Sequence, residues 1–463
     1  METPLQLCGV LAVLIMVIGI GIWSGRYIRS GADFEYGDGK SGAGFVSGII
    51  MGTLVGGAST VGTAQLAYTQ GISAAWYSIS CGLGCLLISF VYVKLFRRAK
   101  LPTLLGIIGN EYGSRLELIS SILVCLVAFI SIIPQLIAST AVLPIIFPGI
   151  SATLSVAVTA VLILVYIVFG GALGAGLLGR VKVVLLYVAV LTGTFIVLQE
   201  SSIGELRAGL EPAFFDLFAN GVGKESSKAL SIILGIVSAQ LYMQAVVSAG
   251  TEKAARRGTL ISAALIPPVG LASALIGMFM RANHPGLANA KDAFPLFTLL
   301  YVPDFLCGVV LATLVLAIVG TSAGALLDLA TVMHRDIIAP RTHRFDDSKA
   351  SLLFTRLCIV FFLVVGCTLS TGILGDTMLT FTTLSSGLRA VTIFPPLMCA
   401  MLFPGRLNRR WVFLAVLAGA GASMVFSLWN VLPIDGMGMG LLSSSICCAI
   451  GAVIQSRSAK LRH

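Results

Sequence analysis

Long apolar runs, separated by short polar segments, make up most of the chain. A helix needs roughly 20 residues to cross a bilayer core about 30 Å thick, and thirteen of the runs have about this length. The alternation of apolar and polar residues that marks a membrane β-strand is absent from them. The pattern predicts an all-α polytopic membrane protein with transmembrane helices at residues 6–24, 43–68, 72–96, 118–146, 151–171, 177–199, 229–249, 259–281, 305–330, 352–372, 378–403, 411–429 and 437–455.

The composition supports this class of protein and excludes others. Of the 463 residues, 57% are hydrophobic and only 11% are charged, whereas a soluble domain carries about a quarter charged residues. A water-soluble enzyme, a disordered chain and a nucleic-acid-binding domain are therefore excluded. The 10 cysteines lie in or beside apolar runs without the spacing of a zinc site or a disulfide framework. We expect them to be small buried hydrophobic residues.

The distribution of basic residues predicts the orientation in the membrane. Of the 30 Lys and Arg residues, 24 fall in the segments on one side of the predicted helices, 5 fall on the other side, and Arg389 falls inside a helix. Because cytoplasmic loops are enriched in Lys and Arg, we expect an outside N-terminus and a cytoplasmic C-terminus in a multi-pass protein of the cell membrane. This bias also explains the net charge of +10 without an anionic partner.

Two connections on the predicted outer side, residues 200–228 and 282–304, are long enough to carry short helices over the membrane surface. No linker or shift in composition marks a separate soluble domain.

Small and hydroxyl residues gather in the middle of two predicted helices. Residues 56–63 contain three glycines and three hydroxyl residues, which suit an unwound turn whose carbonyls coordinate a small cation. Close helix packing through small residues is the alternative. Residues 317–325 are also rich in small and hydroxyl residues. Hydroxyl and carbonyl oxygens are the ligands that hard cations prefer. Asp328, toward the cytoplasmic end, is the one acid inside a predicted helix, so a proton relay built on acids has little support.

Several strongly polar side chains lie deep in the predicted membrane region. Arg389 must face protein or water and have a partner, and its planar guanidinium fits a carboxylate. One interpretation is that Arg389 contacts the substrate or a gate. The alternative is a structural role, in which it caps the carbonyls of a broken helix or pairs with an acid of the protein. Gln240, Tyr242 and Gln244 cannot share one face of an intact helix. They indicate a second interrupted helix, or ordinary hydrogen bonds between helices.

The ordered set of these motifs resembles the solute:sodium symporter family over roughly residues 7–405. The resemblance implies the inverted-repeat fold of the leucine transporter, with two five-helix copies of opposite orientation, a broken first helix in each copy, one helix before them and two after. Four stretches carry the likeness: residues 56–63 with Tyr68 and Gly71; Gly170 and Gly171; Gln244 with residues 251–258; and residues 317–321 with 335–337. The implied divisions of the chain are residues 1–40, 41–200, 201–405 and 406–463.

The resemblance also implies where the co-transported sodium and the solute bind. The solute would lie at the membrane midplane between the two broken helices, near Thr60, Thr63, Gln240, Tyr242, Gln244 and Arg389. The common sodium site of the family falls on the carbonyls of Ala58, Val61 and Ala317 and on two hydroxyl positions, which are Gly320 and Thr321 here. Gly320 has no hydroxyl, so one ligand must come from a carbonyl, a water molecule or Ser322.

A second departure from the family pattern concerns basic residues. Gly179 stands where many members have an aspartate that assists sodium, and Lys182 replaces a glutamine. The additional sodium site of some members is therefore not expected. In the same broad fold, some proton-coupled transporters place a lysine amine at the sodium position, and Lys182 or Arg180 is a candidate for this role. Alternatively, both are inner-face residues, with Lys182 paired to Asp328.

These observations predict a sodium-driven importer of a small organic solute that works by alternating access in a lipid bilayer. Arg389 favours a carboxylate or another anion. The alternative is a proton-coupled or sodium-independent transporter that uses Lys182. A nutrient sensor is a further alternative, disfavoured because only residues 455–463 follow the last predicted helix. We expect no organic cofactor, no nucleic acid and no enzymatic centre, since all four histidines fall in predicted loops or the tail. The oligomeric state, the solute and the stoichiometry do not follow from the sequence.

Overall fold

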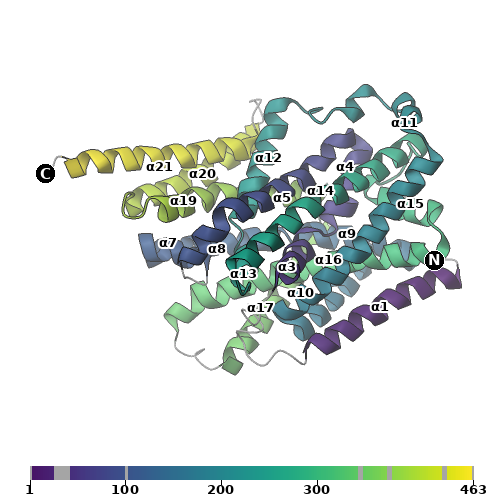
Figure 1. Ribbon diagram of the computed structural model, residues 1–463, viewed down its shortest axis with the longest axis horizontal. Helices are drawn as coiled ribbons and strands as arrows, with labels where there is room; N and C mark the ends of the chain where they lie inside the picture. Colours follow the sequence, from purple (N-terminus) through teal and green to yellow (C-terminus); the bar gives the residue numbers. More distant parts are fainter. Residues whose placement is uncertain are drawn as a thin grey trace.

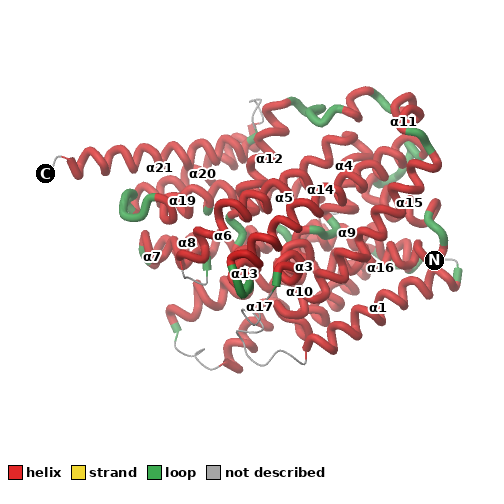
Figure 2. Tube along the Cα trace, in the orientation of Figure 1, coloured by secondary structure: helices red, strands yellow, loops and turns green. Residues whose placement is uncertain are grey.

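The computed structural model describes residues 3–25, 42–99, 103–342, 348–372, 378–429 and 435–460. The regular elements in these ranges are helical (Figure 2). The expected boundary between residues 40 and 41 lies outside the described residues. The helices of the first half of the chain are α1 (Pro4–Gly25), α3 (Ala43–Leu54), η1 (Ala58–Gly62), α4 (Thr63–Gln70), η2 (Gly71–Ala75), α5 (Trp76–Leu87), η3 (Ile88–Tyr92), α6 (Val93–Ala99), α7 (Leu104–Tyr112), α8 (Ser114–Ile130), α9 (Ile133–Ile146), α10 (Ala152–Glu200), α11 (Ile203–Gly209) and η4 (Pro212–Phe215).

The second half of the chain continues the helical arrangement (Figure 1). Helices α20 and α21 lie side by side and project from the body at the left of the view, toward the C-terminus. The helices are α12 (Val222–Val237), α13 (Gln240–Val247), α14 (Glu252–Asn283), η5 (Ala290–Asp292), α15 (Ala293–Tyr301), α16 (Asp304–Val332), η6 (Met333–Ile338), η7 (Ala339–Arg341), α17 (Ser348–Gly372), α18 (Met378–Thr392), α19 (Phe394–Leu402), α20 (Arg409–Trp429) and α21 (Gly436–Lys460).

Within the described residues, nine helical stretches are long and apolar enough to cross a membrane, or ten if the bent pair α12 and α13 counts as one. Each of the thirteen expected runs overlaps a described helix. Three of them correspond to apolar helices of 10 to 17 residues, at Pro4–Val17, Ala43–Leu54 and Ala152–Ile167. The exact number of thirteen transmembrane helices therefore stays a prediction.

Two local expectations about helix ends are wrong. Residues 172–176 were expected to connect two helices, but the backbone is helical throughout α10, and this stretch contains no proline that would end a helix. His334 was expected in a loop, but it is buried in η6, because helical structure continues beyond α16.

Both interruptions that the sequence predicts are present. The first separates α3 from η1, a π-helical turn that leads into α4. Its free backbone amides are satisfied by side chains: Gly56 N donates to Ser59 Oγ at 2.8 Å and Gly57 N donates to Gln135 Oε1 at 2.8 Å. The second separates α12 from α13 at residues 238–239 and bends the chain by 46°. Such breaks are tolerated at membrane depth where other groups satisfy the backbone.

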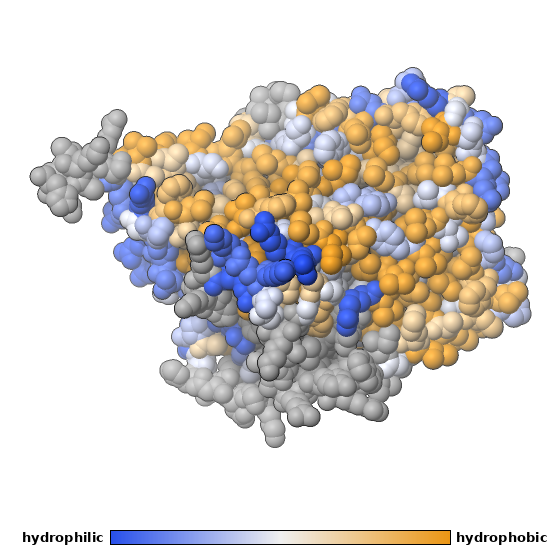
Figure 3. All heavy atoms as spheres, in the orientation of Figure 1, coloured by the Kyte–Doolittle hydropathy of each residue, from blue (hydrophilic) through white to orange (hydrophobic). Residues whose placement is uncertain are grey.

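Short helices cover one end of the bundle, as the sequence predicts for its two longer connections. The first connection contains α11 and η4, and the second contains η5 and α15. The Tyr68 hydroxyl at the end of α4 fixes the second connection, because it donates to His284 O at 2.7 Å and accepts from Leu287 N at 3.1 Å. Figure 3 shows hydrophilic residues at this end and in a patch toward the opposite end, with a mostly hydrophobic surface between them. A protein that spans a membrane has such a surface.

All ten cysteines are free thiols. Five are buried, as expected for small apolar side chains, but Cys8 on α1 is exposed. Its side chain belongs to an exposed apolar face of α1 that includes Leu5, Leu7 and Leu11.

Candidate functional site

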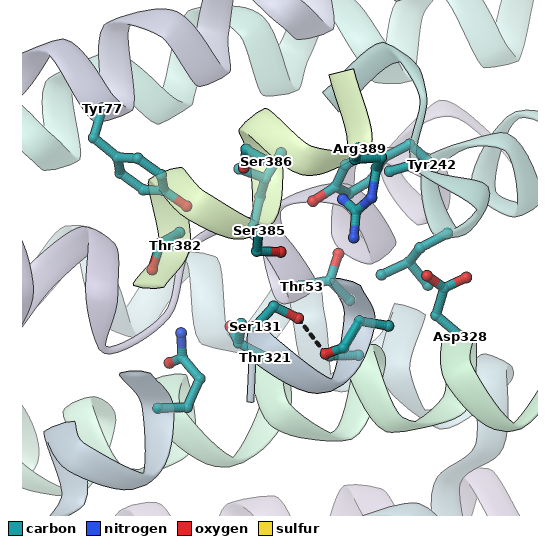
Figure 4. A pocket seen from close by; sticks show the side chains of 16 residues that line it. Thr53, Tyr77, Ser131, Tyr242, Thr321, Asp328, Thr382, Ser385, Ser386 and Arg389 are labelled. Carbon is teal, nitrogen blue, oxygen red and sulfur yellow. Dashed lines mark hydrogen bonds between the residues drawn. The ribbon is translucent and has the colours of Figure 1, made fainter. Parts of the chain in front are cut away.

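A cavity lies where the two broken helices meet α5, α9, α16 and α18 (Figure 4). The volume open to the centre of a water-sized sphere is about 70 Å³. One water molecule needs roughly 10–15 Å³ by this measure, so the cavity has room for several water molecules or a small solute. It is lined by Thr53, Leu54, Tyr77, Ala128, Ser131, Gln135, Ala239, Leu241, Tyr242, Thr321, Ala325, Asp328, Thr382, Ser385, Ser386 and Arg389.

Two groups of opposite charge line this cavity. Arg389 reaches it from α18, and Asp328 reaches it from α16 (Figure 4). Neither side chain forms an ion pair with a described residue, and both the Arg389 Nε and the Asp328 Oδ1 are buried without a hydrogen-bond partner in the described part of the chain. A buried polar group without a partner is costly, and both residues also line the cavity.

The other residues expected near the solute are distributed differently. Of the six, Tyr242 and Arg389 line the cavity. Gln240 is 1% exposed, and its Oε1 accepts from the first amide of α7 at 2.7 Å. Thr60 donates to Gly56 O at 2.8 Å and Thr63 to Ala58 O at 3.5 Å, so both hydroxyls bond to their own helix. Gln244 is buried outside the cavity lining.

Most polar cavity residues were not identified from the sequence. They include Tyr77 from α5 and the hydroxyl residues Thr382, Ser385 and Ser386 from α18 (Figure 4). Gln135 had a usable signal, because it is the one amide side chain in the apolar run 118–146. It joins the two parts of the site, since it both lines the cavity and caps the first helix break.

A lysine ammonium lies among the residues expected to hold sodium. Lys182 of α10 is 1% exposed. Its Nζ donates to Gly52 O at 2.6 Å, to Ala317 O at 3.0 Å and to Thr321 Oγ1 at 3.1 Å. The geometry therefore brings Ala317 and Thr321 of α16 together with the end of α3. It does not pair Lys182 with Asp328.

Of the remaining expected sodium ligands, only Gly320 borders this site in the structure. A Cβ added at Gly320 would lie 3.5 Å from the Lys182 Nζ, so Gly320 borders the ammonium without contributing a hydroxyl. Ala58 and Val61 are not among the hydrogen-bond partners of Lys182. Both are buried in η1, after the helix break.

Close contact between α10 and α3 explains how the lysine reaches this position. A Cβ added at Gly179 would overlap the carbonyl oxygen of Gly48, so the two backbones touch there. Lys182 lies about one turn further along α10, and Gly52 lies about one turn further along α3. A residue with a side chain at position 179, such as aspartate, would force the two helices apart.

Several solved structures share the fold of this protein. A Na⁺-coupled sialic acid symporter in a substrate-bound outward-open state matches with a TM-score of 0.82 at 16% identity, over 98% of each chain. A nucleobase-cation-symport-1 family transporter matches with a TM-score of 0.61 at 14% identity, over 93% of this chain and 95% of that one. A manganese transporter from Eremococcus coleocola matches with a TM-score of 0.56 at 15% identity, over 91% and 95%.

These matches to solved structures show the fold, which is that of polytopic transporters of the leucine-transporter type, and all three proteins are transporters rather than enzymes. A model of the sodium:solute symporter family matches residues 36–419, a range that contains both helix breaks and every residue that lines the cavity. The chain therefore belongs to the sodium:solute symporter family, and this membership supports a role as a sodium-coupled membrane symporter of a small solute.

Proposed function

We propose that this protein imports a small zwitterionic solute, one that carries both a carboxylate and an ammonium group, by alternating access across the cell membrane. The observation that carries the proposal is the pair of opposite charges in the cavity. Arg389 and Asp328 line the same small space, and neither forms an ion pair with a described residue.

Arg389 supplies the partner for the carboxylate. Placing an arginine at membrane depth costs about 2.5–3.5 kcal/mol on insertion scales, which is offset only if the guanidinium finds a partner. Its planar group bonds a carboxylate through two parallel N–H donors.

Asp328 distinguishes a zwitterion from a simple anion. An anionic solute would satisfy Arg389 but would bring a second negative charge toward the carboxyl group of Asp328. An ammonium group on the solute would instead give the Asp328 Oδ1, which is buried without a partner, a charge-assisted hydrogen bond. The cavity would then hold two opposite pairs and no net charge.

The position of the cavity suits alternating access. Thr53 and Leu54 come from the end of α3 beside the first break, and Ala239 and Tyr242 come from the second break and α13. A solute held here would contact both broken helices beside their breaks. We assign no solute contact to Gln240, because its side chain accepts a hydrogen bond from α7.

A ligand screen with matched analogues tests the proposal. The purified protein is heated with small amino acids such as alanine, and in parallel with propionate and ethylamine, which lack the amine and the carboxylate respectively. We expect thermal stabilisation by amino acids and none by either analogue at equal concentration. Equal stabilisation by propionate and alanine would contradict the role of Asp328.

Substitutions of the two charged residues assign the contacts. Arg389→Gln and Asp328→Asn should each weaken binding of the zwitterion by roughly 10- to 150-fold, the effect of losing a hydrogen bond to a charged group. Arg410→Gln and Asp304→Asn are the matched controls, because neither residue lines the cavity and Arg410 is exposed. The controls should leave the affinity unchanged.

A further inference from the structure

The surroundings of the Lys182 Nζ have the composition of a cation site. Two backbone carbonyls and one hydroxyl, from Gly52, Ala317 and Thr321, surround it. An ammonium group has three N–H donors and no acceptor, so these three oxygens use its full hydrogen-bonding capacity. The same kinds of oxygen are the ligands of a hard metal cation.

No carboxylate balances this charge within the described residues. Helices α3 and α9 pack against α10 and carry no ionisable side chain. Of the acids on α16, Asp304 accepts a hydrogen bond from Gln6 at 2.9 Å, and Asp328 faces the cavity. Lys182 is thus held by dipoles alone, in the way a protein holds a small bound cation rather than a structural ion pair.

We propose that the side chain of Lys182 is a built-in cation that fills the sodium position of this protein, so that sodium does not bind there. A sodium ion coordinated by Ala317 O and Thr321 Oγ1 would have to take the place of the Nζ, which lies within 3.1 Å of both atoms. Two cations cannot share three oxygens, and a displaced ammonium would be buried without acceptors at a large cost.

Position 320 supports the same conclusion independently of these hydrogen bonds. A serine or threonine there would add a hydroxyl beside the ammonium, because the Cβ alone would lie 3.5 Å from the Nζ. Glycine leaves this space to the lysine. The residue that would complete a sodium site is thus absent from the position where the lysine end is present.

Direct measurement of sodium binding tests the proposal. Radioactive ²²Na⁺ is added to the purified full-length protein without any solute, and saturable binding is measured for the wild type and Lys182→Ala. We expect the wild type to show no saturable binding that Thr321→Ala removes, and Lys182→Ala, in which the oxygens lose a charged hydrogen-bond partner, to gain such binding. Adding Gly320→Ser to this variant should tighten binding further.

Arg180→Gln is the matched control, because Arg180 is an exposed basic residue two positions away on the same helix. It should bind no more sodium than the wild type. Saturable binding to the wild type that Thr321→Ala removes would overturn the proposal, and so would a folded Lys182→Ala that binds no more sodium than the wild type. If Lys182→Ala does not fold, Lys182→Gln replaces it, and if neither folds, the wild-type measurement decides. Because no solute is present, these outcomes do not depend on the zwitterion proposal.

Discussion

Replacing Gln135 with leucine should destabilise the first broken helix. Gln135 is 3% exposed, and its Oε1 accepts from Gly57 N at 2.8 Å, where the helix ladder is interrupted. Leucine has a similar size but no acceptor, so the Gly57 amide would remain buried without a partner. Such a group costs about 1–3 kcal/mol, and the upper end applies at membrane depth, where water is absent.

The free energy of unfolding of the Gln135→Leu variant should therefore fall by about 2–3 kcal/mol, which changes the ratio of folded to unfolded protein by roughly 30- to 150-fold. Unfolding by sodium dodecyl sulfate in mixed micelles measures this quantity. Because Gln135 also lines the cavity, solute affinity should fall in the same variant.

Ser139→Ala provides the control from the same helix. Ser139 lies about one turn from Gln135 in α9, is equally buried, and donates to Leu136 O at 2.6 Å within its own helix. Removal of the Ser139 hydroxyl leaves no backbone amide without an acceptor, because its partner is the carbonyl of Leu136 within the same helix. We expect a change below about 1 kcal/mol. If Gln135→Leu is no less stable than Ser139→Ala, the capping of the break by Gln135 contributes nothing, and the reasoning fails.

Three further predictions address packing, helix capping and orientation. Gly179→Ala should lower the thermal stability of the protein in detergent, because the added methyl group overlaps the Gly48 carbonyl, and an unchanged melting curve would contradict this contact. Gln240→Leu should accelerate hydrogen exchange at the start of α7, whose first amide loses its acceptor. In intact cells, a membrane-impermeant maleimide should label Glu211→Cys, but not Lys253→Cys, above the level of the parent protein with its native cysteines, and the reverse pattern would invert the expected orientation.

The sequence predicts the first helix break well because this break depends on local chemistry. Residues 56 and 57 are adjacent glycines, which weaken a helix, and hydroxyl residues that can satisfy the exposed backbone follow them. The second break lies at residues 238–239, just before Gln240, Tyr242 and Gln244. These three residues belong to the unbroken helix α13, so their spacing is not the cause of the break.

The cavity is harder to predict because it depends on how distant helices rotate against each other. Arg389 was identified because arginine is rare at membrane depth. By contrast, Tyr77 and Ser385 lie in stretches rich in small and hydroxyl residues, where the sequence does not mark one face as the lining face. Asp328 is unusual in the sequence, but only the arrangement of α16 and α18 around one cavity brings it near Arg389 (Figure 4).

The position of Lys182 also depends on how distant helices pack, which the sequence does not show. The sequence offers two interpretations, a cation at the sodium position and a basic residue at the cytoplasmic mouth. The choice depends on the contact between Gly179 and Gly48, which lets α10 approach α3 closely enough for the Nζ to reach Gly52 O. A close contact between two backbones is indicated in a sequence only by glycines. Because glycines also occur in turns and helix caps, they do not identify such a contact by themselves.

The cation site and the solute cavity are physically continuous, and this constrains how the transporter moves. Thr321 both accepts a hydrogen bond from Lys182 and lines the cavity, and Thr53, which also lines it, directly follows Gly52. The ammonium therefore links α10, α3 and α16 beside the solute. A free ion can leave such a site when α3 and α16 separate, whereas an ammonium stays attached to α10. Separation of α3 from α16 must then break the hydrogen bonds of Lys182 to one of these two helices, and the bonds that remain are those to the helix with which α10 moves.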